Sequence, residues 1–450
     1  MSEETEVQDP NRYWHPKQGW LTSHFKIIPR EEYQPTIERL GTETELMFRK
    51  PYSFAEAPEA REIFKEDWEE KSISHEAAAS VIELMTFPQP NVGALAQNQY
   101  VLMSKAVAWA EAHDLRILPV ACEPLHYSMQ PDWDWYYMKN LVEKYGAGAQ
   151  RICGMTGSVQ LNLQIESGDA ALFCHEGWTR AMPIMIALSA SSPFHQGLPT
   201  GLLSFRTLVR GLYLNGGPVP EPIPAGTTWA EYHEMSKKLM KMQEVCKAPF
   251  DHNLPLRLRL DRGCLEVGIM DMIADHGQYR ALIDLCRRLT WQMLVCYKEG
   301  RQLPAFLGTS YNRALRHNLK RSAMHGRNGT MHDANLDILS IRQAIESTIT
   351  WAAQAPADPT QGWSETEKVL AHILENGNSA EQMMQSFRGY HPYCPDPMRG
   401  CPNCKDAVRS VCEEVSRLFH IQYHADAQEF REPCNKPSVS TGAGDQAVAE

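Results

Sequence analysis

The chain has 450 residues, and its 44 Lys and Arg against 55 Asp and Glu give a formal net charge of −11 at pH 7. Hydrophobic residues make up 43% and aromatic residues 9%, a globular composition that excludes a disordered or fibrous protein. The acidic balance, without any stripe of Lys or Arg, argues against nucleic acid as a partner, because binding to phosphates requires clustered positive charge.

The first residues, the apolar runs and the cysteines of the chain indicate where in the cell to expect it. The first ten residues, MSEETEVQDP, are polar and acidic, so we expect no secretory signal. The most apolar run, PIMIALSA at 183–190, is far shorter than the roughly 20 residues that span a bilayer. Twelve cysteines at irregular spacing fit reduced thiols better than a disulfide framework. We therefore expect a cytoplasmic protein with no membrane partner.

Apolar periodicity divides the chain into elements. Residues 1–38 are rich in proline and charge and are predicted to form an irregular leader. The patterns that follow predict strands at 41–48, 80–86, 117–121 and 158–165, helices at 56–70, 93–113, 133–145 and 169–190, a loop at 216–226 and a β-hairpin at 256–271. The rest is predicted to be mostly helical from 278 to 387, followed by a Cys- and Pro-rich insert at 391–404, a helix at 405–419 and a disordered tail at 436–450.

The organisation of these elements indicates the fold class. No linker interrupts residues 39–390, which we expect to form one α+β domain, with 391–435 as a Cys-rich insert and C-terminal helix. The predicted sheet is largely antiparallel, curved, lined with carboxylates and backed by helices. No glycine-rich turn joins a strand to a helix and no Walker A sequence is present, so a nucleotide would not be held on a P-loop.

Four of the predicted strands carry polar, mostly anionic, side chains among apolar neighbours. In GTETELMF two glutamates lie two residues apart, and in SVQLNLQI a glutamine and an asparagine repeat that spacing, so each pair points to one face of its strand. The residues concerned are Glu43, Glu45, Glu83, Gln160, Asn162 and Glu266.

If these faces converge, the carboxylates cannot all be anionic in a low-dielectric cleft without compensation. Divalent cations bound through oxygen ligands provide it, and Mg²⁺ in such a site usually also holds substrate phosphates. The alternative is that these are solvated faces of ordinary antiparallel strands. That is the commoner explanation for a single pair such as Glu43 and Glu45, and the four strands together leave both interpretations open.

The segments GTETELMF, SHEAAASVIELMT, SASSPFHQGLPTGLLSFRT and LRLRLDRGCLEVGIMD occur in an order and spacing that resemble the glutamate–cysteine ligase type 2, or carboxylate–amine ligase, family. The resemblance covers roughly residues 40–390, and the SPF–G–TG–S–R string at 192–206 is its most specific part. It implies a glutamine-synthetase-like domain and an ATP-dependent ligase that forms an amide through an acyl phosphate. Its default substrates are glutamate and cysteine or another small amine.

The resemblance also implies roles for individual residues. Two or three Mg²⁺ ions would be held by the carboxylates of Glu43, Glu45, Glu76, Glu83 and Glu266. ATP and the transferring phosphate would be contacted by Arg257, Asn318 and Arg321, with Arg257, Arg321 and Glu266 in catalytic roles. The substrate would lie near Arg206, Gln160 and Asn162. The alternative for the arginines is a solvated surface position, and for Asn318 a surface amide.

Four positions, in three segments, depart from the family pattern. Gln160 and Asn162 stand where many relatives have metal-binding histidines, and Glu123 stands where one branch has histidine. Gly268 stands where the family usually has an arginine that reaches the substrate carboxylate or phosphate, and Arg259 is a candidate replacement. These changes leave two further functions open: a specialised amide ligase of a secondary-metabolite pathway, and an inactive relative that acts as a binding subunit.

The insert contains the one cysteine cluster with metal-ligand spacing. A structural zinc ion at Cys394, Cys401 and Cys404, with His391 or Cys412 as a further ligand, is one interpretation. Thiols in a loop are favoured over it, and a redox pair comes third. The partners that we expect are small molecules, namely an amino acid, an amine and ATP, and the sequence leaves a homo-oligomer open.

Overall fold

The computed structural model describes residues 12–15, 19–22, 24–67, 72–76, 78–126, 129–130, 153–214, 226–232, 255–260, 262–358, 362–392, 400–401 and 403–427, and the single positions 142, 146, 148, 223 and 360. Most of the predicted helix at 133–145, most of the predicted loop at 216–226 and the predicted tail at 436–450 lie outside these residues.

A seven-stranded antiparallel sheet forms the centre of the described structure. Its strands follow the order β10-β11-β7-β3-β5-β4, and β6 pairs with β3. The strands are β3 Leu40–Arg49, β4 Ile73–His75, β5 Val81–Met85, β6 Arg116–Leu118, β7 Ser158–Gln164, β10 Leu256–Arg259 and β11 Cys264–Asp271. Because strands that are distant in sequence become neighbours here, the sheet gathers side chains from residues 40 to 271 on each of its faces.

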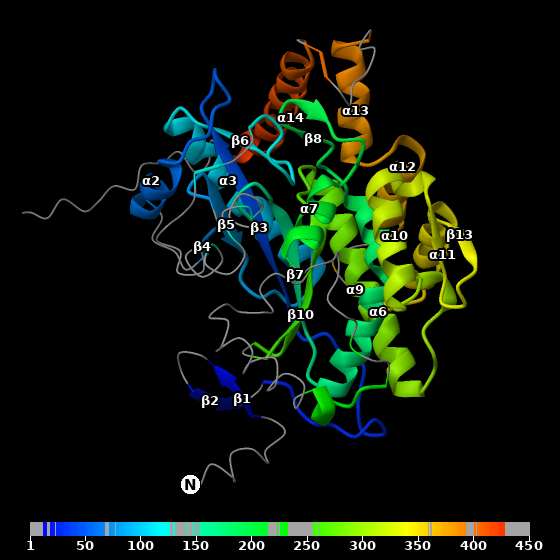
Figure 1. Cartoon of the computed structure of the whole chain (residues 1–450). Helices are drawn as coiled ribbons and strands as arrows, with labels where there is room; N and C mark the ends of the chain where they lie inside the picture. The colour runs from blue at the N-terminus through cyan, green and yellow to red at the C-terminus, as the bar shows by residue number, and fades with distance from the viewer. Residues whose placement is uncertain are drawn as a thin grey trace, which may run out of the picture.

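Helices cover one face of this sheet, and Figure 1 shows α6, α9, α10, α11 and α12 gathered on the same side of the strands. The helices are α2 Ala60–Asp67, α3 Val92–Ala112, α6 Gly168–Ser189, α7 Phe205–Leu214, α9 His276–Glu299, α10 Asn312–His325, α11 Ile341–Ala352, α12 Trp363–Asn376, α13 Ser379–Tyr390 and α14 Cys404–Ala427, with short 3₁₀ turns η1 Ala305–Leu307 and η2 Gly326–Asn328. Among the described helices, none combines the length and the apolar character that crossing a membrane requires.

The two faces of the sheet differ because apolar and polar residues alternate along the strands. On β7, Val159, Leu161 and Leu163 are fully buried and belong to the same apolar core as α3, α6 and α9. A hydrogen bond at 2.7 Å between Thr42 Oγ1 and Tyr279 Oη links β3 to α9 within this layer. The polar side chains of the same strands are left on the opposite face.

Local capping explains where the long helices begin and end. Ser167 accepts a hydrogen bond from the backbone N–H of Ala170 at the start of α6, and Asp275 accepts one from Gln278 at the start of α9. The latter helix ends at Gly300, whose φ of 66° is in the left-handed region that glycine adopts readily. These two helices therefore have well-defined lengths over the sheet.

Several elements differ from the prediction. The leader contains a hairpin of β1 Arg12–His15 and β2 Gly19–Thr22 instead of irregular chain throughout. The predicted helix at 56–70 begins only with α2, two residues after Pro58, and its last three residues lie outside the described part of the chain. The helix predicted at 405–419 continues to Ala427. Two further short hairpins, β8 Phe194–His195 with β9 Leu198–Pro199 and β12 Thr330–His332 with β13 Ile338–Ser340, fall in segments without strong alternation.

The last helix, α14, completes the core instead of standing apart from it. It packs against α3 and β6. Ser416 Oγ donates to the carbonyl of Ile117 at 2.7 Å, and the N–H of Ile117 donates to His420 Nε2 at 3.0 Å. These two side chains thus bind the backbone N–H and carbonyl of Ile117 on the edge of β6 that faces away from β3.

A fully buried ion pair joins β3 to the segment after β6. Arg49 and Glu123 are both 0% exposed, and their side chains are in contact. Glu123 also accepts hydrogen bonds from the backbone N–H groups of Leu125 and His126, at 2.7 and 2.9 Å. Burial lowers the pKa of Arg49 to about 10, so the guanidinium stays charged at neutral pH and requires its carboxylate partner.

We expect Glu123→Ala to lower the free energy of unfolding by about 3 kcal/mol, because it leaves the charge of Arg49 buried without its partner. Urea unfolding measures this, with the exposed Glu375→Ala as the control. The double variant Arg49→Met/Glu123→Leu removes both charges and should recover most of the loss. An unchanged unfolding midpoint in Glu123→Ala would contradict the assignment.

Candidate active site

The polar face of the sheet brings together acidic residues from three strands, β3, β5 and β11. Glu45 on β3 lies directly opposite Glu83 on β5, and Glu43 lies opposite Gln160 on β7. Glu266 on β11 lies opposite Asn162 on β7. Directly opposed residues of an antiparallel pair project to the same face. The register therefore places the four strand carboxylates in one row across the sheet, although their role as metal ligands stays a prediction.

These carboxylates are buried. The exposed fractions of Glu43, Glu45, Glu83 and Glu266 are 6%, 3%, 6% and 2%. Glu76, in the segment after β4, joins them: it offers an oxygen that lies with oxygens of Glu45 and Glu83 within 4.8 Å of one another. Three acidic groups at this separation, largely withdrawn from water, are unfavourable unless a cation or protons compensate them.

Neutral donors hold the middle of the row. Ser158 Oγ donates to Glu45 at 3.0 Å, and Gln160 Nε2 donates to Glu45 at 2.9 Å and to Glu83 at 3.5 Å. Asn162 Nδ2 donates to Glu43 at 3.3 Å. Gln160 and Asn162, predicted near the substrate, therefore orient carboxylates here. An amide orients an anion without cancelling its charge, so the negative potential of the middle of the row persists.

The negative charge of this row affects the pKa of Glu83. Burial raises its pKa well above the ordinary value, and repulsion from Glu43, Glu76, Glu45 and Glu266 raises it further. Repulsion among these carboxylates thus favours a protonated Glu83 unless a cation compensates them.

Arginines compensate one end of the row. Arg257 Nε lies 2.6 Å from Glu266 Oε1, and Arg259 Nη1 donates to Glu266 Oε2 at 2.8 Å. Burial alone would raise the pKa of Glu266, but these two guanidinium groups outweigh it and lower the pKa below its ordinary value. Arg262, in the β10–β11 turn, donates to Glu43 at 3.1 Å. The site therefore has a cationic edge beside an anionic centre.

The string of small residues at 192–206 folds onto the end of β11. The buried carboxylate of Asp271 accepts hydrogen bonds from the N–H of Ser191 at 3.0 Å, from Ser192 Oγ at 2.8 Å and from Ser204 Oγ at 3.0 Å. Burial raises the pKa of Asp271, while these donors and Arg206 oppose the rise. The serines of the motif thus fix the strand that carries Glu266.

Arg206 contacts the backbone of the same strand. Its side chain is 4% exposed and donates to the carbonyl oxygens of residues 268–270, at 2.9 to 3.3 Å. The pairing of β11 with β7 shifts register between Val267 and Met270, at these carbonyls. The residue predicted to lie near the substrate therefore supports the irregular part of β11, and burial lowers its pKa to about 10.

The residues predicted from α10 lie in a different layer. Asn318 is fully buried, its Nδ2 donates to the carbonyl of His332 at 2.8 Å and its Oδ1 accepts from the N–H of His332 at 2.7 Å. Both ends of this amide thus bind the backbone of β12. The helix packs against α6, α7 and β12. The described contacts of Asn318 are structural ones, and a nucleotide role for Arg321 stays a prediction.

Three contributors were missed by the sequence reasoning. Ser158 follows the same two-apart spacing as Gln160 and Asn162, which is the signal that could have found it. Arg262 lies within the hairpin predicted at 256–271 but was given no role, because the reach of its side chain to Glu43 depends on strand order. Asp271 ends the acidic hairpin, but its serine partners lie about 70 to 80 residues earlier in the chain.

Comparisons with known proteins decide the family. The model of glutamate–cysteine ligase family 2 matches residues 39–413. The chain belongs to this family. A Paenarthrobacter aurescens protein named for glutamate–cysteine ligase 2-3 is 21% identical over 407 residues, which cover 88% of this chain and 92% of the relative. The glutamate–cysteine ligase of Natronomonas pharaonis is 25% identical over 283 residues, covering 61% of this chain and 71% of the relative.

Solved structures share the fold. A glutamate–cysteine ligase from Francisella tularensis, solved in complex with AMP, matches with a TM-score of 0.56 and 11% identity over 88% of this chain and 93% of its own. A bifunctional glutathione synthetase from Pasteurella multocida matches with a TM-score of 0.53 and 15% identity, over 87% of this chain and 53% of its own. The predicted family and the α+β, glutamine-synthetase-like fold are confirmed, and this family member is an ATP-dependent carbon–nitrogen ligase.

The family implies ATP and a divalent metal, and the residues of this ligase fit them. Hard cations bind carboxylate oxygens, and Glu45, Glu76 and Glu83 present three such oxygens within 4.8 Å of one another. The raised pKa of Glu83 in the metal-free protein points the same way, because a cation would replace the proton that this group favours.

We expect Glu83→Gln to stabilise the metal-free ligase at pH 8 while reducing its activity. The folded pKa of Glu83 is raised above the unfolded value of about 4.5, so its unfavourable contribution appears as pH rises from that value through the folded pKa. Glutamine is neutral throughout, and the melting temperature in chelator should rise by about 2 °C or more.

The gain should shrink at pH 4, where Glu83 is protonated, and the exposed Glu375→Gln should show no such pattern. A melting temperature for Glu83→Gln below that of the wild type at pH 8 would contradict the repulsion that we describe.

Arg206→Lys separates a positioning role from substrate binding. A single ammonium group cannot reach the three carbonyls that the guanidinium spans, so the register of β11 should loosen. We expect kcat to fall at least about tenfold and the melting temperature to drop, with little change in the KM of the carboxylate substrate. A rise in KM with unchanged kcat and stability would instead favour direct substrate binding.

Proposed function

We propose that this ligase joins the carboxylate of an amino acid to a small amine at the acidic face of the sheet, through an acyl-phosphate intermediate. The observation that carries the proposal is the convergence of Glu43, Glu45, Glu83 and Glu266 on one buried face, with Glu76 beside them. Glutamate is the default donor, and cysteine or another small amine is the default acceptor.

The reaction proceeds in two steps. An oxygen of the substrate carboxylate attacks the γ-phosphorus of ATP, the bond to the β-phosphate oxygen breaks, and ADP leaves. The amine nitrogen then attacks the acyl carbon, phosphate leaves, and the nitrogen gives up a proton to form the amide. The acyl phosphate must be kept from water, or hydrolysis replaces ligation.

The carboxylate row would hold two or three Mg²⁺ ions, whose chemistry is to neutralise phosphate oxygens and stabilise the charge on the transferring group. In our proposal, Glu43, Glu45, Glu76, Glu83 and Glu266 provide the ligands. The hydrogen bonds from Ser158 and Gln160 orient Glu45 for this purpose, because an oriented carboxylate needs little rearrangement when the cation binds.

The cationic edge is suited to the nucleotide. Arg257 is 9% exposed and lies against Glu266, which fixes the direction of its guanidinium group. An arginine fixed in this way beside the carboxylate row can stabilise the charge of a transferring phosphate. We propose Arg257 for this role, with Arg321 as the further cation that the resemblance implies.

A specialised amide ligase is the second candidate, and Gly268 favours it. The family arginine is absent here, and a Cβ at this position would lie 3.6 Å from the Pro255 carbonyl and 3.7 Å from Gln160 Cγ, which are ordinary contacts. The backbone at position 268 thus accommodates a Cβ. Arg259, the candidate replacement, is already bound to Glu266, which supports a donor other than glutamate.

The decisive experiment is ADP release by the purified chain with Mg²⁺ and ATP, across a matrix of amino-acid donors and amine acceptors. We expect one donor and acceptor pair to release ADP, and Glu266→Gln and Glu45→Gln to reduce that release at least a hundredfold. Glu375→Gln, at an exposed position, is the matched control.

The pattern of outcomes separates the candidates. Turnover with glutamate and cysteine supports the default substrates, and turnover with a different pair supports a specialised ligase. No turnover with any pair, together with equal ATP binding by the wild type and Glu266→Gln, would overturn the proposal in favour of an inactive binding subunit.

A further inference from the structure

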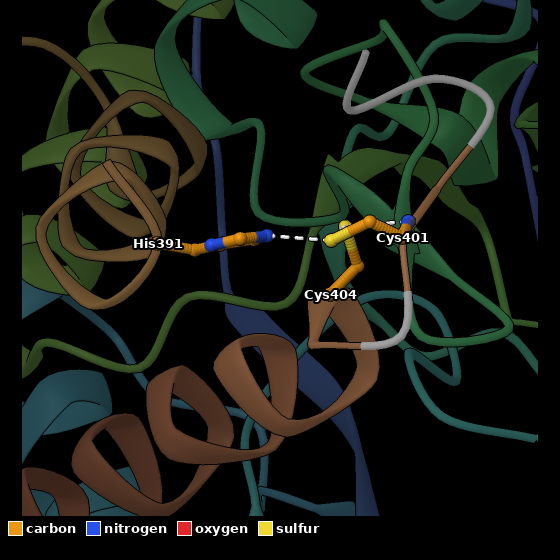
Figure 2. A group of neighbouring side chains, drawn as sticks. All are labelled: His391, Cys401 and Cys404. Carbon is orange, nitrogen blue, oxygen red and sulfur yellow. Dashed lines mark hydrogen bonds between the residues drawn. The ribbon is translucent and has the colours of Figure 1, made fainter. Parts of the chain in front are cut away.

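A histidine and two cysteines meet at the opposite end of the molecule from the leader, between α13 and α14. Figure 2 shows the His391 ring pointing from the end of one helix towards the sulfur atoms of Cys401 and Cys404. His391 Nε2 lies 2.7 Å from Cys401 Sγ, and the two sulfur atoms lie 3.5 Å apart. All three ligand atoms lie within 4.8 Å of one another. No reaction step proposed for the ligase uses these residues.

The local backbone is shaped to hold this cluster. His391 caps the end of α13, and Cys404 is the first residue of α14. Between them, the N–H of Cys404 donates to the carbonyl of Cys401 at 3.0 Å, and the N–H of Cys401 donates to Cys404 Sγ at 3.3 Å. This tight turn, with a backbone donor on sulfur, brings both thiols of the Cys-x-x-Cys segment to the same side.

The distances match those of a tetrahedral zinc site. Zinc–sulfur bonds of about 2.3 Å and zinc–nitrogen bonds of about 2.0 Å place two sulfur ligands about 3.7 Å apart and a sulfur and a nitrogen about 3.5 Å apart. The two cysteines are already at 3.5 Å. The ring of His391, which is half-buried, needs to withdraw from Cys401 by about 0.8 Å.

The chemistry of the donors favours a metal over the alternatives. A disulfide needs no histidine and requires sulfur atoms at about 2 Å, whereas these lie 3.5 Å apart. Thiolate and imidazole together are the ligands that select zinc among the common cellular metals. Cys404 is 0% exposed, and a thiolate in that position requires a cation beside it.

We propose that His391, Cys401 and Cys404 bind a structural zinc ion that joins the end of α13 to the start of α14. The sequence also named Cys394, which lies outside the described residues, and the proposal rests on the three that the structure brings together. The ion would complete the edge of an apolar cluster that contains Phe387 of α13 and Val408 of α14.

Another element of the domain packs against the junction of α13 and α14. The β8–β9 hairpin lies beneath it: the Phe194 and Phe387 rings are 5.6 Å apart, and Gly197 packs against Lys405. This hairpin belongs to the same 192–206 string whose serines hold Asp271. The zinc ion therefore supports, from outside, the segment that fixes the strand carrying Glu266.

The first test measures zinc in the purified full-length chain by mass spectrometry of the elements. We expect about one zinc per chain in the wild type, and at least a fivefold lower content in His391→Ala, Cys401→Ser and Cys404→Ser. Cys412→Ala changes a buried cysteine of the same helix that lies outside the cluster, and it should keep its zinc. Zinc-selective chelation, which leaves Mg²⁺ in place, should lower the melting temperature of the wild type and of Cys412→Ala, but not that of the three ligand variants.

A second measurement does not depend on how the variants fold. The wild type, stripped of zinc and titrated with Co²⁺, should develop the intense visible bands of a tetrahedral site and the near-ultraviolet charge-transfer bands of thiolate ligands. Loss of both bands on adding one equivalent of zinc would support the same site.

Three results would overturn the proposal. A wild-type chain without zinc after expression in zinc-supplemented medium is one. A second such result is an unchanged zinc content in all three variants. The ion would then be bound elsewhere in the chain, for example by the carboxylates of the sheet. An intact mass lower by two hydrogens, with Cys401 and Cys404 linked in the peptide map, would establish a redox pair instead.

Discussion

Repulsion between carboxylates on one buried face is the constraint on which the structure depends. Glu45 and Glu83 face each other across adjacent strands, with Glu43 and Glu76 close by, and burial makes each charge costly. The fold tolerates this arrangement because everything around it is fixed: apolar helices cover the other face, amides orient the acids, and arginines occupy one edge. In our proposal, this row of acids receives the cations that accompany the phosphates of ATP.

The support of β11 shows how far this constraint extends into the chain. Asp271 collects three serine donors, and Arg206 spans three consecutive carbonyls where the strand loses its regular register. The hydrogen bonds described for these two side chains go to serines and to the backbone of β11. The most recognisable motif of the sequence therefore maintains the shape of the site, and recognition of a family by its motif does not by itself say which residues meet the substrate.

The sequence predicted the acidic face well because strand periodicity is local: residues two apart, such as Glu43 and Glu45, point to the same side in any sheet. The strand order and register that bring Glu83 opposite Glu45 depend on long-range pairing, and no spacing reveals them. For the same reason the partners of Asn318 and Arg262 could not be found. The cluster of His391, Cys401 and Cys404 was visible as a spacing, but its geometry depends on how two helices end and begin.

The contact between β6 and α14 has a consequence for the order in which the chain is made. Ile117 offers its N–H and carbonyl to His420 and Ser416, which are synthesised about 300 residues later. At ribosomal rates of about 5 to 20 residues per second, about 15 to 60 s pass between the synthesis of this strand and that of α14. During that interval a nascent chain exposes both an unpaired edge and the apolar side of α3. The last helix is thus a closing element, and a chain released before it is complete would present a surface that chaperones and proteases recognise.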